Sequence, residues 1–416
     1  MSNTTHNPAH TWGHNLAFSE EYYREAHRLL TETLDDVPRL TEVAVRAVDT
    51  IRAGNTVYAN VTTGHMPTDE LANEREGNPA PFFYQGPDNC TPEQYAGMKE
   101  GDLFLTNQVN EDVRAVRDRG VHVVVYTTCY IDSGGAPEGW VTPNADNLLP
   151  ADVANEVFTT RIPWQQGLVH APEVPEMEVF PGSSNITCSL HWCLTAEVAH
   201  ALGSGSDATP DGAKAREYLG VLLQRLEAFH AAHATGIDEL AATLAERVIS
   251  GGHVDLRGAN EAVRSEVHGV AQGLMLMCAF EPRPASDGGD KDTMIITAVS
   301  ADDPTDLGTA ADARGNGNLV VGIGPGTATA LREACDVYME NGCDETAGVV
   351  EVAGADAPVC PVSGIVNNVA AQMLVAQMAD EMCRRGALPF FYMGLYRSGG
   401  REYNSLLRHH FQARGY

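Results

Sequence analysis

The hydrophobic and polar positions of the chain recur in one order that appears twice. The pattern at 20–51 predicts helix, and a glycine break separates it from an apolar run at 56–61 that predicts a strand. A polar loop at 62–65 follows this strand. Later, the predicted helix at 218–248 leads through two glycines to a short strand and the polar stretch 257–261. We therefore expect two copies of one unit.

Two further strands are predicted in each copy. Residues 99–107 form a charged turn that leads into an apolar strand, and residues 290–297 repeat this pattern. A third run, apolar and β-branched, occurs at 122–128 and again at 319–323, as is typical of parallel strands buried on both faces. Strands that alternate with helices at this spacing predict an α/β protein with a doubly wound parallel sheet in each copy.

Each copy ends in a polar turn that leads into a long apolar helix. Ser183 and Ser363 mark these two turns and lie 180 residues apart. We expect a first domain at 15–203, a linker rich in Gly, Ser and Asp at 204–213, and a second domain at 214–416. The two copies are then expected to pack about a pseudo-twofold axis, as the subunits of a homodimer would, so that sites can form between them. The alternative is a generic α/β similarity without duplication.

Composition narrows the class of protein. The chain has 416 residues, 43% of them hydrophobic, and a net charge of −29 that argues against nucleic acid and anionic membrane surfaces as partners. No apolar run reaches the roughly 18 to 20 residues that cross a bilayer. The nine cysteines show no paired metal-ligand spacing, which is typical of reduced thiols. We therefore expect a cytoplasmic protein that does not bind membranes.

Two stretches could suggest a cofactor or a metal. The glycine-rich segment 322–326 is interrupted by Pro325 and lacks the order of a dinucleotide-binding loop. The histidines His6, His10 and His14 lie in a polar terminal segment whose composition accounts for them without a metal. We expect neither a cofactor nor a metal.

Four short segments resemble the sugar isomerase (SIS) domain family, in particular its phosphosugar-binding branch. They are Thr62-Thr63-Gly64-His65, Asp69-Glu70-Leu71, Thr106-Asn107 and Ser398-Gly399-Gly400-Arg401-Glu402-Tyr403-Asn404. The sequence departs from the family at Gln108 and Val109, where the family has a second hydroxyl and a glycine, and at Tyr403, where it has a histidine. The resemblance implies two tandem, flavodoxin-like SIS domains and a sugar phosphate ligand.

The resemblance also implies which residues act. An aldose–ketose isomerase needs a base that moves a proton between adjacent carbons and a group that opens the sugar ring. Glu70 is the expected proton shuttle, His65 the expected ring-opening group, and Glu402 a further catalytic candidate. The expected substrate-binding residues are Thr62, Thr63, Gly64, Thr106, Asn107, Ser183, Ser184, Arg397 and Asn404.

Each candidate also has a purely structural interpretation. His65 could be a capping or solvated histidine, and Glu70 a first-turn acid that complements a helix dipole. Ser183 and Ser184 precede an apolar helix, where side chains commonly cap the first turn. The closing segment, including Glu402, could be a solvated terminal helix.

Three functions remain open at this point. The first is an aldose–ketose isomerase acting on a sugar phosphate, with one complete site assembled from both copies. The second is a non-catalytic sugar-phosphate sensor, and the third is a lyase or etherase acting on an amino-sugar phosphate. A homodimer is possible in each case.

Overall fold

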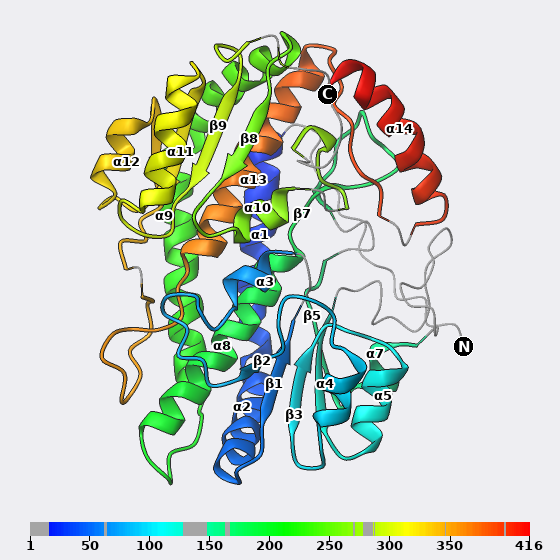
Figure 1. Cartoon of the computed structure of the whole chain (residues 1–416), viewed down its shortest axis with the longest axis vertical. Helices are drawn as coiled ribbons and strands as arrows, with labels where there is room; N and C mark the ends of the chain where they lie inside the picture. The colour runs from blue at the N-terminus through cyan, green and yellow to red at the C-terminus, as the bar shows by residue number, and fades with distance from the viewer. Residues whose placement is uncertain are drawn as a thin grey trace.

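Two parallel sheets and a set of long helices that runs along both make up the molecule (Figure 1). The computed structural model describes residues 16–61, 65–127, 148–162, 167–268, 271–277, 286, 288–345, 347–394 and 397–416.

The first sheet has five parallel strands in the order β2-β1-β3-β4-β5. Its strands are β1 (Val57–Asn60), β2 (Phe83–Tyr84), β3 (Leu103–Thr106), β4 (His122–Thr127) and β5 (Glu156–Thr159). This is the strand order of a flavodoxin-like, doubly wound sheet. Strands β3 and β4 are apolar and almost wholly buried, which explains why their sequences predict strands covered on both faces.

The second sheet is also parallel and has the order β11-β10-β9-β8. Its strands are β8 (Val254–Arg257), β9 (Thr293–Thr297), β10 (Leu319–Gly324) and β11 (Val337–Glu340). In chain order these strands correspond to β1, β3, β4 and β5 of the first sheet. The predicted pair of parallel α/β sheets is thus confirmed.

The long helices lie on the inner face of both sheets. They are α1 (Phe18–Glu32), α2 (Val37–Arg52), α8 (Ser183–Gly203), α9 (Ala213–Ile249) and α13 (Ser363–Arg384). The predicted helix at 20–51 is interrupted by a 3₁₀ turn, η1 (Thr33–Asp36). Pro38, in the first turn of α2, explains this break, because proline has no N–H group to continue the hydrogen-bond ladder of α1. The corresponding segment of the second copy forms the single helix α9.

Shorter elements complete the fold. The helices are α3 (Met66–Glu70), α4 (Pro92–Gly97), α5 (Glu111–Asp118), α7 (Pro150–Val153), α10 (Ala262–Val267), α11 (Pro304–Gly315), α12 (Thr329–Ala334) and α14 (Gly400–Arg414). A 3₁₀ turn, η2 (Met275–Met277), and an antiparallel strand pair, β6 (Gly167–Val169) with β7 (Val179–Pro181), lie outside the two main sheets.

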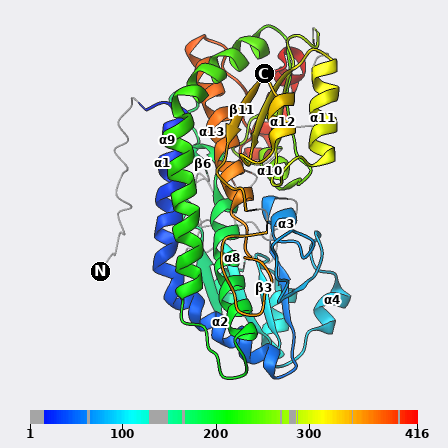
Figure 2. The ribbon, with the colours of Figure 1, turned by 90° about the vertical axis from the view of Figure 1, so that its left-hand side faces the viewer.

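One hydrophobic core is shared by the two copies. It includes buried side chains from Phe18 to Phe411, whereas two smaller clusters fill the space between each sheet and its own outer helices. Figure 2 shows α1 alongside α9 and α13, and α1 indeed packs more extensively on α13 than on any helix of its own copy. Burial of apolar surface therefore holds the copies together as one unit.

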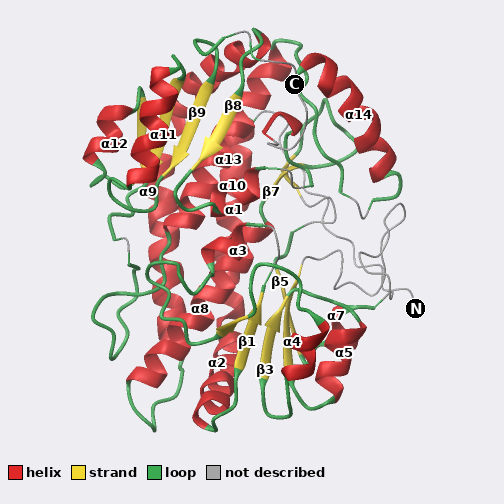
Figure 3. Cartoon of the chain, viewed as in Figure 1, coloured by secondary structure: helices red, strands yellow, loops and turns green. Residues whose placement is uncertain are grey.

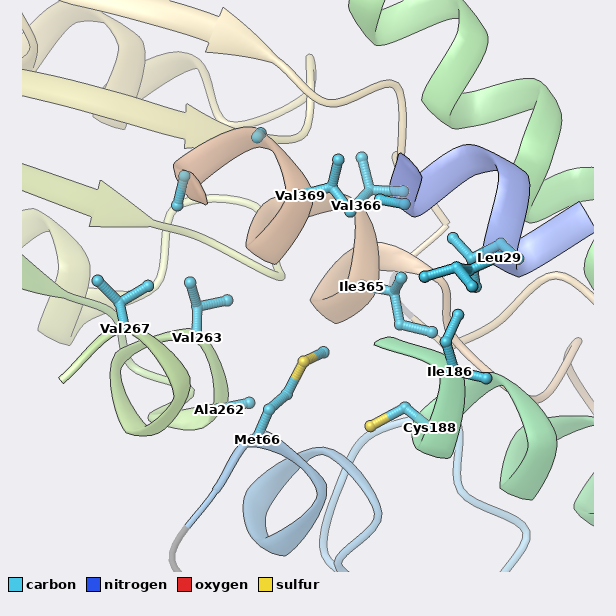
Figure 4. Close-up of a cluster of buried hydrophobic side chains, with 14 of the residues drawn as sticks. Leu29, Met66, Ile186, Cys188, Ala262, Val263, Val267, Ile365, Val366 and Val369 are labelled. Carbon is cyan, nitrogen blue, oxygen red and sulfur yellow. The ribbon is translucent and has the colours of Figure 1, made fainter. Parts of the chain in front are cut away.

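The carboxyl ends of the two sheets face one another across the middle of the molecule. Helix α3 follows β1, α10 follows β8, and α3 packs directly on α10 (Figure 1). Figure 4 shows Met66 of α3 between Ala262 and Val263 of α10 on one side and Cys188 of α8 on the other. This junction is where polar side chains from both copies meet. Figure 3, coloured by secondary structure, shows the same junction as a helical layer between the sheets.

Candidate functional site

The first sheet brings two of the predicted loops to one edge. Strand β1 ends at Asn60 and β3 at Thr106, and these two residues are partners in register. Beyond the strand ends, the amide of Gln108 donates a hydrogen bond to the side-chain oxygen of Asn60. The hydroxyl of Thr106 accepts one from the Gln108 N–H at 3.0 Å. Thr106 is fully buried and Asn107 half-buried.

The other predicted loop, which we call the histidine loop, comprises residues Thr62 to His65. Its first part, Thr62 to Gly64, lies outside the described residues.

Helix α5, which follows Thr106 and Asn107, already has its own cap. Asn110 accepts a hydrogen bond from the Val113 N–H at 2.9 Å, and Glu111 and Asp112 occupy the first turn of α5. In the second copy, Asp303 caps the equivalent helix α11. Acidic side chains complement the positive end of a helix dipole but oppose a second anion there. These two helix ends are therefore poorly suited to a phosphate.

His65 lies at the junction of the two copies. It immediately precedes α3 but makes no side-chain cap hydrogen bond. Its Nδ1 lies 3.6 Å from Oε2 of Glu266, a residue of α10 in the second copy. The imidazole is 41% exposed, whereas the Glu266 side chain is 1% exposed. The histidine can therefore contact a ligand while a buried carboxylate fixes one side of its ring.

The Glu266 carboxylate is held by groups from the first copy. The Ser184 hydroxyl donates a hydrogen bond to Oε2 at 2.7 Å, and the Met66 N–H donates another at 3.4 Å. Ser184 is in the first turn of α8, so a long helix, a short helix and the histidine loop converge on one oxygen. We call His65, Glu266 and Ser184 the histidine centre.

The charges of the histidine centre reinforce one another. Burial acts to lower the pKa of His65, but the interaction of the imidazole with the Glu266 carboxylate outweighs burial and raises that pKa above its usual value. Burial acts to raise the pKa of Glu266, but His65, Ser184 and the Met66 N–H together hold it below its usual value. The pair therefore favours an imidazolium beside a carboxylate.

Glu70 lies in a different cluster. Its side chain has no exposed surface, and Nε of Arg75 donates a hydrogen bond to its Oε2 at 3.2 Å. The Arg75 side chain is itself 3% exposed and also donates to the Ser363 hydroxyl at 2.8 Å. Burial raises the pKa of Glu70, and the positive charge of Arg75 counteracts part of this effect. We call Glu70, Arg75 and Ser363 the arginine centre.

The remaining predicted residues lie in several places. Ser183 is half-buried at the start of α8. Asn404 is buried, and its amide both accepts from the Met393 N–H at 2.8 Å and donates to the Met393 carbonyl at 2.9 Å. These two bonds fasten α14 to the preceding segment. Glu402 is exposed in the first turn of α14, and Arg397 is half-buried just before that helix.

Sequence reasoning missed Glu266. A signal for it exists, because α3 and α10 begin 196 residues apart and Glu70 and Glu266 are separated by the same interval. Counting along the repeat from Glu70 would have pointed to Glu266. The second-copy loop before α10 does not resemble the family motif, so only the repeat interval points to Glu266.

The described residues contain neither a candidate metal site nor a candidate membrane-spanning helix. Within those residues, no group of three or more His, Cys, Asp or Glu side chains could hold a metal ion. None of the described helices is both long and apolar enough to span a membrane.

The comparisons with known proteins bear on the fold. No family model and no curated protein matches the chain. Among solved structures, a proposed phosphosugar isomerase from Clostridium difficile 630 is similar with a TM-score of 0.51 and 12% identity, over 89% of this chain and 94% of that one. Tagatose-6-phosphate ketose/aldose isomerase from Escherichia coli gives a TM-score of 0.49, with 9% identity over 91% of this chain and 96% of that one.

A proposed phosphosugar isomerase from Silicibacter pomeroyi DSS-3 gives a TM-score of 0.47, with 14% identity over 89% of this chain and 99% of that one. At these identities the likeness concerns the fold alone, and the argument rests on the Clostridium difficile structure. The match extends over 89% of this chain and so includes both copies. The tandem SIS-like fold expected from the sequence is therefore confirmed.

Proposed function

We propose that this protein is a sugar-phosphate isomerase whose substrate contacts His65. The observation that carries the proposal is the histidine centre, in which a partly exposed imidazole is paired with a buried carboxylate where the carboxyl ends of both sheets meet. Open α/β sheets bind their ligands at the carboxyl ends of their strands. The tandem SIS-like fold supports the same class of ligand.

The geometry suits proton transfer. Nδ1 of His65 faces Glu266, so Nε2, on the opposite side of the ring, is the atom available to a substrate. As an imidazolium, His65 can donate a proton to the ring oxygen while the anomeric hydroxyl gives its proton to water. The bond between the anomeric carbon and the ring oxygen then breaks, and the anomeric carbon forms the carbonyl of the open chain. As a neutral base it can then take the proton from the carbon next to the carbonyl and return it to the adjacent carbon. Glu266 orients the imidazole and stabilises its charged form.

The other predicted residues take supporting roles in this proposal. The loop containing Thr62, Thr63 and Gly64, together with Asn107, would contact the phosphate. The role of Glu70 as proton shuttle stays a prediction, and it requires Arg75 to release the carboxylate. Glu402 and Arg397 stay candidates that would approach from the α14 side.

One observation favours a second candidate function. The helix ends that would face a phosphate, at α5 and α11, are capped by Asn110 and Asp303 and carry acidic first turns. This arrangement favours a ligand without a phosphate. The second candidate is therefore an enzyme or sensor for an unphosphorylated sugar.

A thermal-shift screen distinguishes the two candidates. Sugar phosphates such as fructose 6-phosphate and ribose 5-phosphate are compared with fructose and ribose, because a ligand at 100 times its Kd stabilises the native state by about 2.7 kcal/mol. We expect the phosphates to raise Tm, and His65→Asn, which keeps a polar side chain but cannot titrate, to weaken the response. A rise with the parent sugars alone supports the second candidate. No response to any sugar contradicts both.

A further inference from the structure

The two buried glutamates are equivalent positions of the repeat. Glu70 ends α3 and Glu266 is the fifth residue of α10, and each helix follows the first strand of its sheet. Between them, the Ser265 hydroxyl donates a hydrogen bond to Asp69 at 2.9 Å. Asp69 and Ser265 are themselves 196 residues apart, so equivalent positions of the two copies touch. This contact marks the pseudo-twofold axis between α3 and α10.

Each glutamate side chain lies against a long helix of the other copy. The Glu266 carboxylate lies on the first turn of α8, a helix of the first copy, where it accepts from Ser184. The Glu70 carboxylate lies on the first turn of α13, a helix of the second copy, against Gly364. Ser184 and Gly364 are 180 residues apart, the same interval that separates the starts of α8 and α13. The fold thus builds two pseudo-equivalent carboxylate sites.

The residues around these carboxylates differ in kind. At Glu266 the neighbouring group is the half-exposed His65, whose equivalent position in the second copy is Glu261. At Glu70 the neighbouring group is the buried Arg75, and the position 196 residues after it is Ala271. The first copy therefore supplies both partners, His65 to the glutamate of the second copy and Arg75 to its own glutamate.

Arg75 and Gly364 are the two residues that determine how the Glu70 carboxylate is held. The guanidinium bonds both the Glu70 carboxylate and the Ser363 hydroxyl. The absence of a side chain at Gly364 lets the carboxylate approach the helix backbone, because a Cβ there would lie 2.2 Å from Oε2 of Glu70. The anion-attracting end of α13 is thus filled by the chain's own carboxylate, whose charge is matched by an arginine.

We infer that Arg75 closes the arginine centre, so that each chain has one open site, at His65 and Glu266. The identity of the ligand in this inference rests on the proposed function, but the closure of the second cluster does not. Arg75 is a structural plug in this account, and Glu266 is a positioning residue for His65.

Chemical labelling tests the closure without any ligand. The native protein is treated with diethyl pyrocarbonate, which modifies histidine, and separately with a carbodiimide and glycine ethyl ester, which modify carboxylates. Peptide mass spectrometry then follows His65, Glu70 and, as an exposed reference in the same chain, Glu402. We expect His65 and Glu402 to react in the native state and Glu70 to react only once denaturant unfolds the chain. Labelling of native Glu70 at the rate of Glu402 overturns the inference.

A matched pair of serine variants tests the consequence for activity. Ser184→Ala and Ser363→Ala each remove one hydroxyl from the first turn of a long helix, at the histidine centre and the arginine centre respectively. With fructose 6-phosphate as the probe, we expect Ser184→Ala to lower kcat/KM by about tenfold or more, because a hydrogen bond to a charged group is lost. Ser363→Ala should stay within about twofold of the wild type.

Calorimetric titration of the wild type with the same probe should give one bound ligand per chain. Two bound ligands, or an equal loss of activity in both serine variants, overturns the inference. Absence of binding and turnover in the wild type contradicts the proposed function instead, and the labelling result then decides the closure by itself.

Discussion

Replacement of Gly364 by alanine tests the position of the Glu70 carboxylate. The added Cβ would lie 2.2 Å from Oε2, 2.4 Å from Cδ and 2.6 Å from Oε1 of Glu70. All three distances are far below van der Waals contact, so the carboxylate must move. It has no exposed surface and is bonded to Arg75, so movement strains the core or separates a buried ion pair.

The cost follows from these contacts. Overpacking of a well-filled core typically costs about 1 to 3 kcal/mol. Removing one partner of a buried ion pair costs about 3 to 5 kcal/mol, which sets the upper limit if Glu70 leaves Arg75 completely. We therefore expect Gly364→Ala to lower the free energy of unfolding by at least about 1 kcal/mol, and by more if the ion pair is lost.

Urea unfolding followed by circular dichroism measures this loss. The matched control is Gly220→Ala, because Gly220 is an exposed helical glycine in α9 with nothing within 4 Å of a Cβ. Alanine there should stabilise the protein by about 0.5 to 1 kcal/mol. In the Gly364→Ala background, Glu70→Ala should cost less than in the wild type, because the overlap is gone. A Gly364→Ala protein as stable as the wild type would refute the position assigned to Glu70.

Three further variants test other contacts. Glu266→Gln should lower the pKa of His65, measured by NMR titration of the imidazole. Because the pKa of His65 is raised in the folded protein, the pair stabilises the fold fully below the ordinary value of about 6.5, and this stabilisation is lost as pH rises through the raised pKa. Because the pKa of Glu266 is lowered in the folded protein, the stabilisation is present above the ordinary value of about 4.5 and is lost as pH falls through the lowered pKa. An unchanged titration would contradict the pairing. Asn404→Ala removes the side-chain partner of the Met393 N–H and carbonyl. The free energy of unfolding should fall by about 1 to 3 kcal/mol, and amide hydrogen exchange in α14 should become faster. Unchanged exchange in α14 would contradict the assigned contact. Glu197→Ala removes a buried carboxylate that accepts a hydrogen bond from the Ala215 N–H, in the first turn of α9, at 2.9 Å. Urea unfolding should show a free energy of unfolding lower by about 1 to 2 kcal/mol. An unchanged free energy of unfolding would argue against this cap.

The sequence was sufficient for the fold because its information is local and repeated. Apolar β-branched runs fixed the main strands of both copies, and the interval between Ser183 and Ser363 located the two long helices. The break before α2 was missed, although Pro38 is a clear local signal for it. The second copy has no proline at that point, and its helix α9 is continuous.

The candidate site was harder to predict because its contacts cross between the copies. His65 was found from its loop, but its partner Glu266 lies about 200 residues away and belongs to a helix whose local sequence shows no motif. The burial of Glu70 could not be seen either, since it depends on Gly364 from the other copy. By contrast, the cap at Asn110 followed by two acids is a local pattern that could have been recognised.

Solvent hydrogen exchange at the substrate tests the central claim, that His65, oriented by Glu266, is the working acid–base group. Fructose 6-phosphate is incubated in D₂O with the wild type, with His65→Asn and with Ser363→Ala, and deuterium at the carbons next to the carbonyl is followed by NMR. We predict deuterium incorporation by the wild type and by Ser363→Ala, and a rate about 10² to 10⁴ times lower in His65→Asn, the range that a positioned general acid–base group supplies. Equal incorporation by His65→Asn and the wild type would contradict the account.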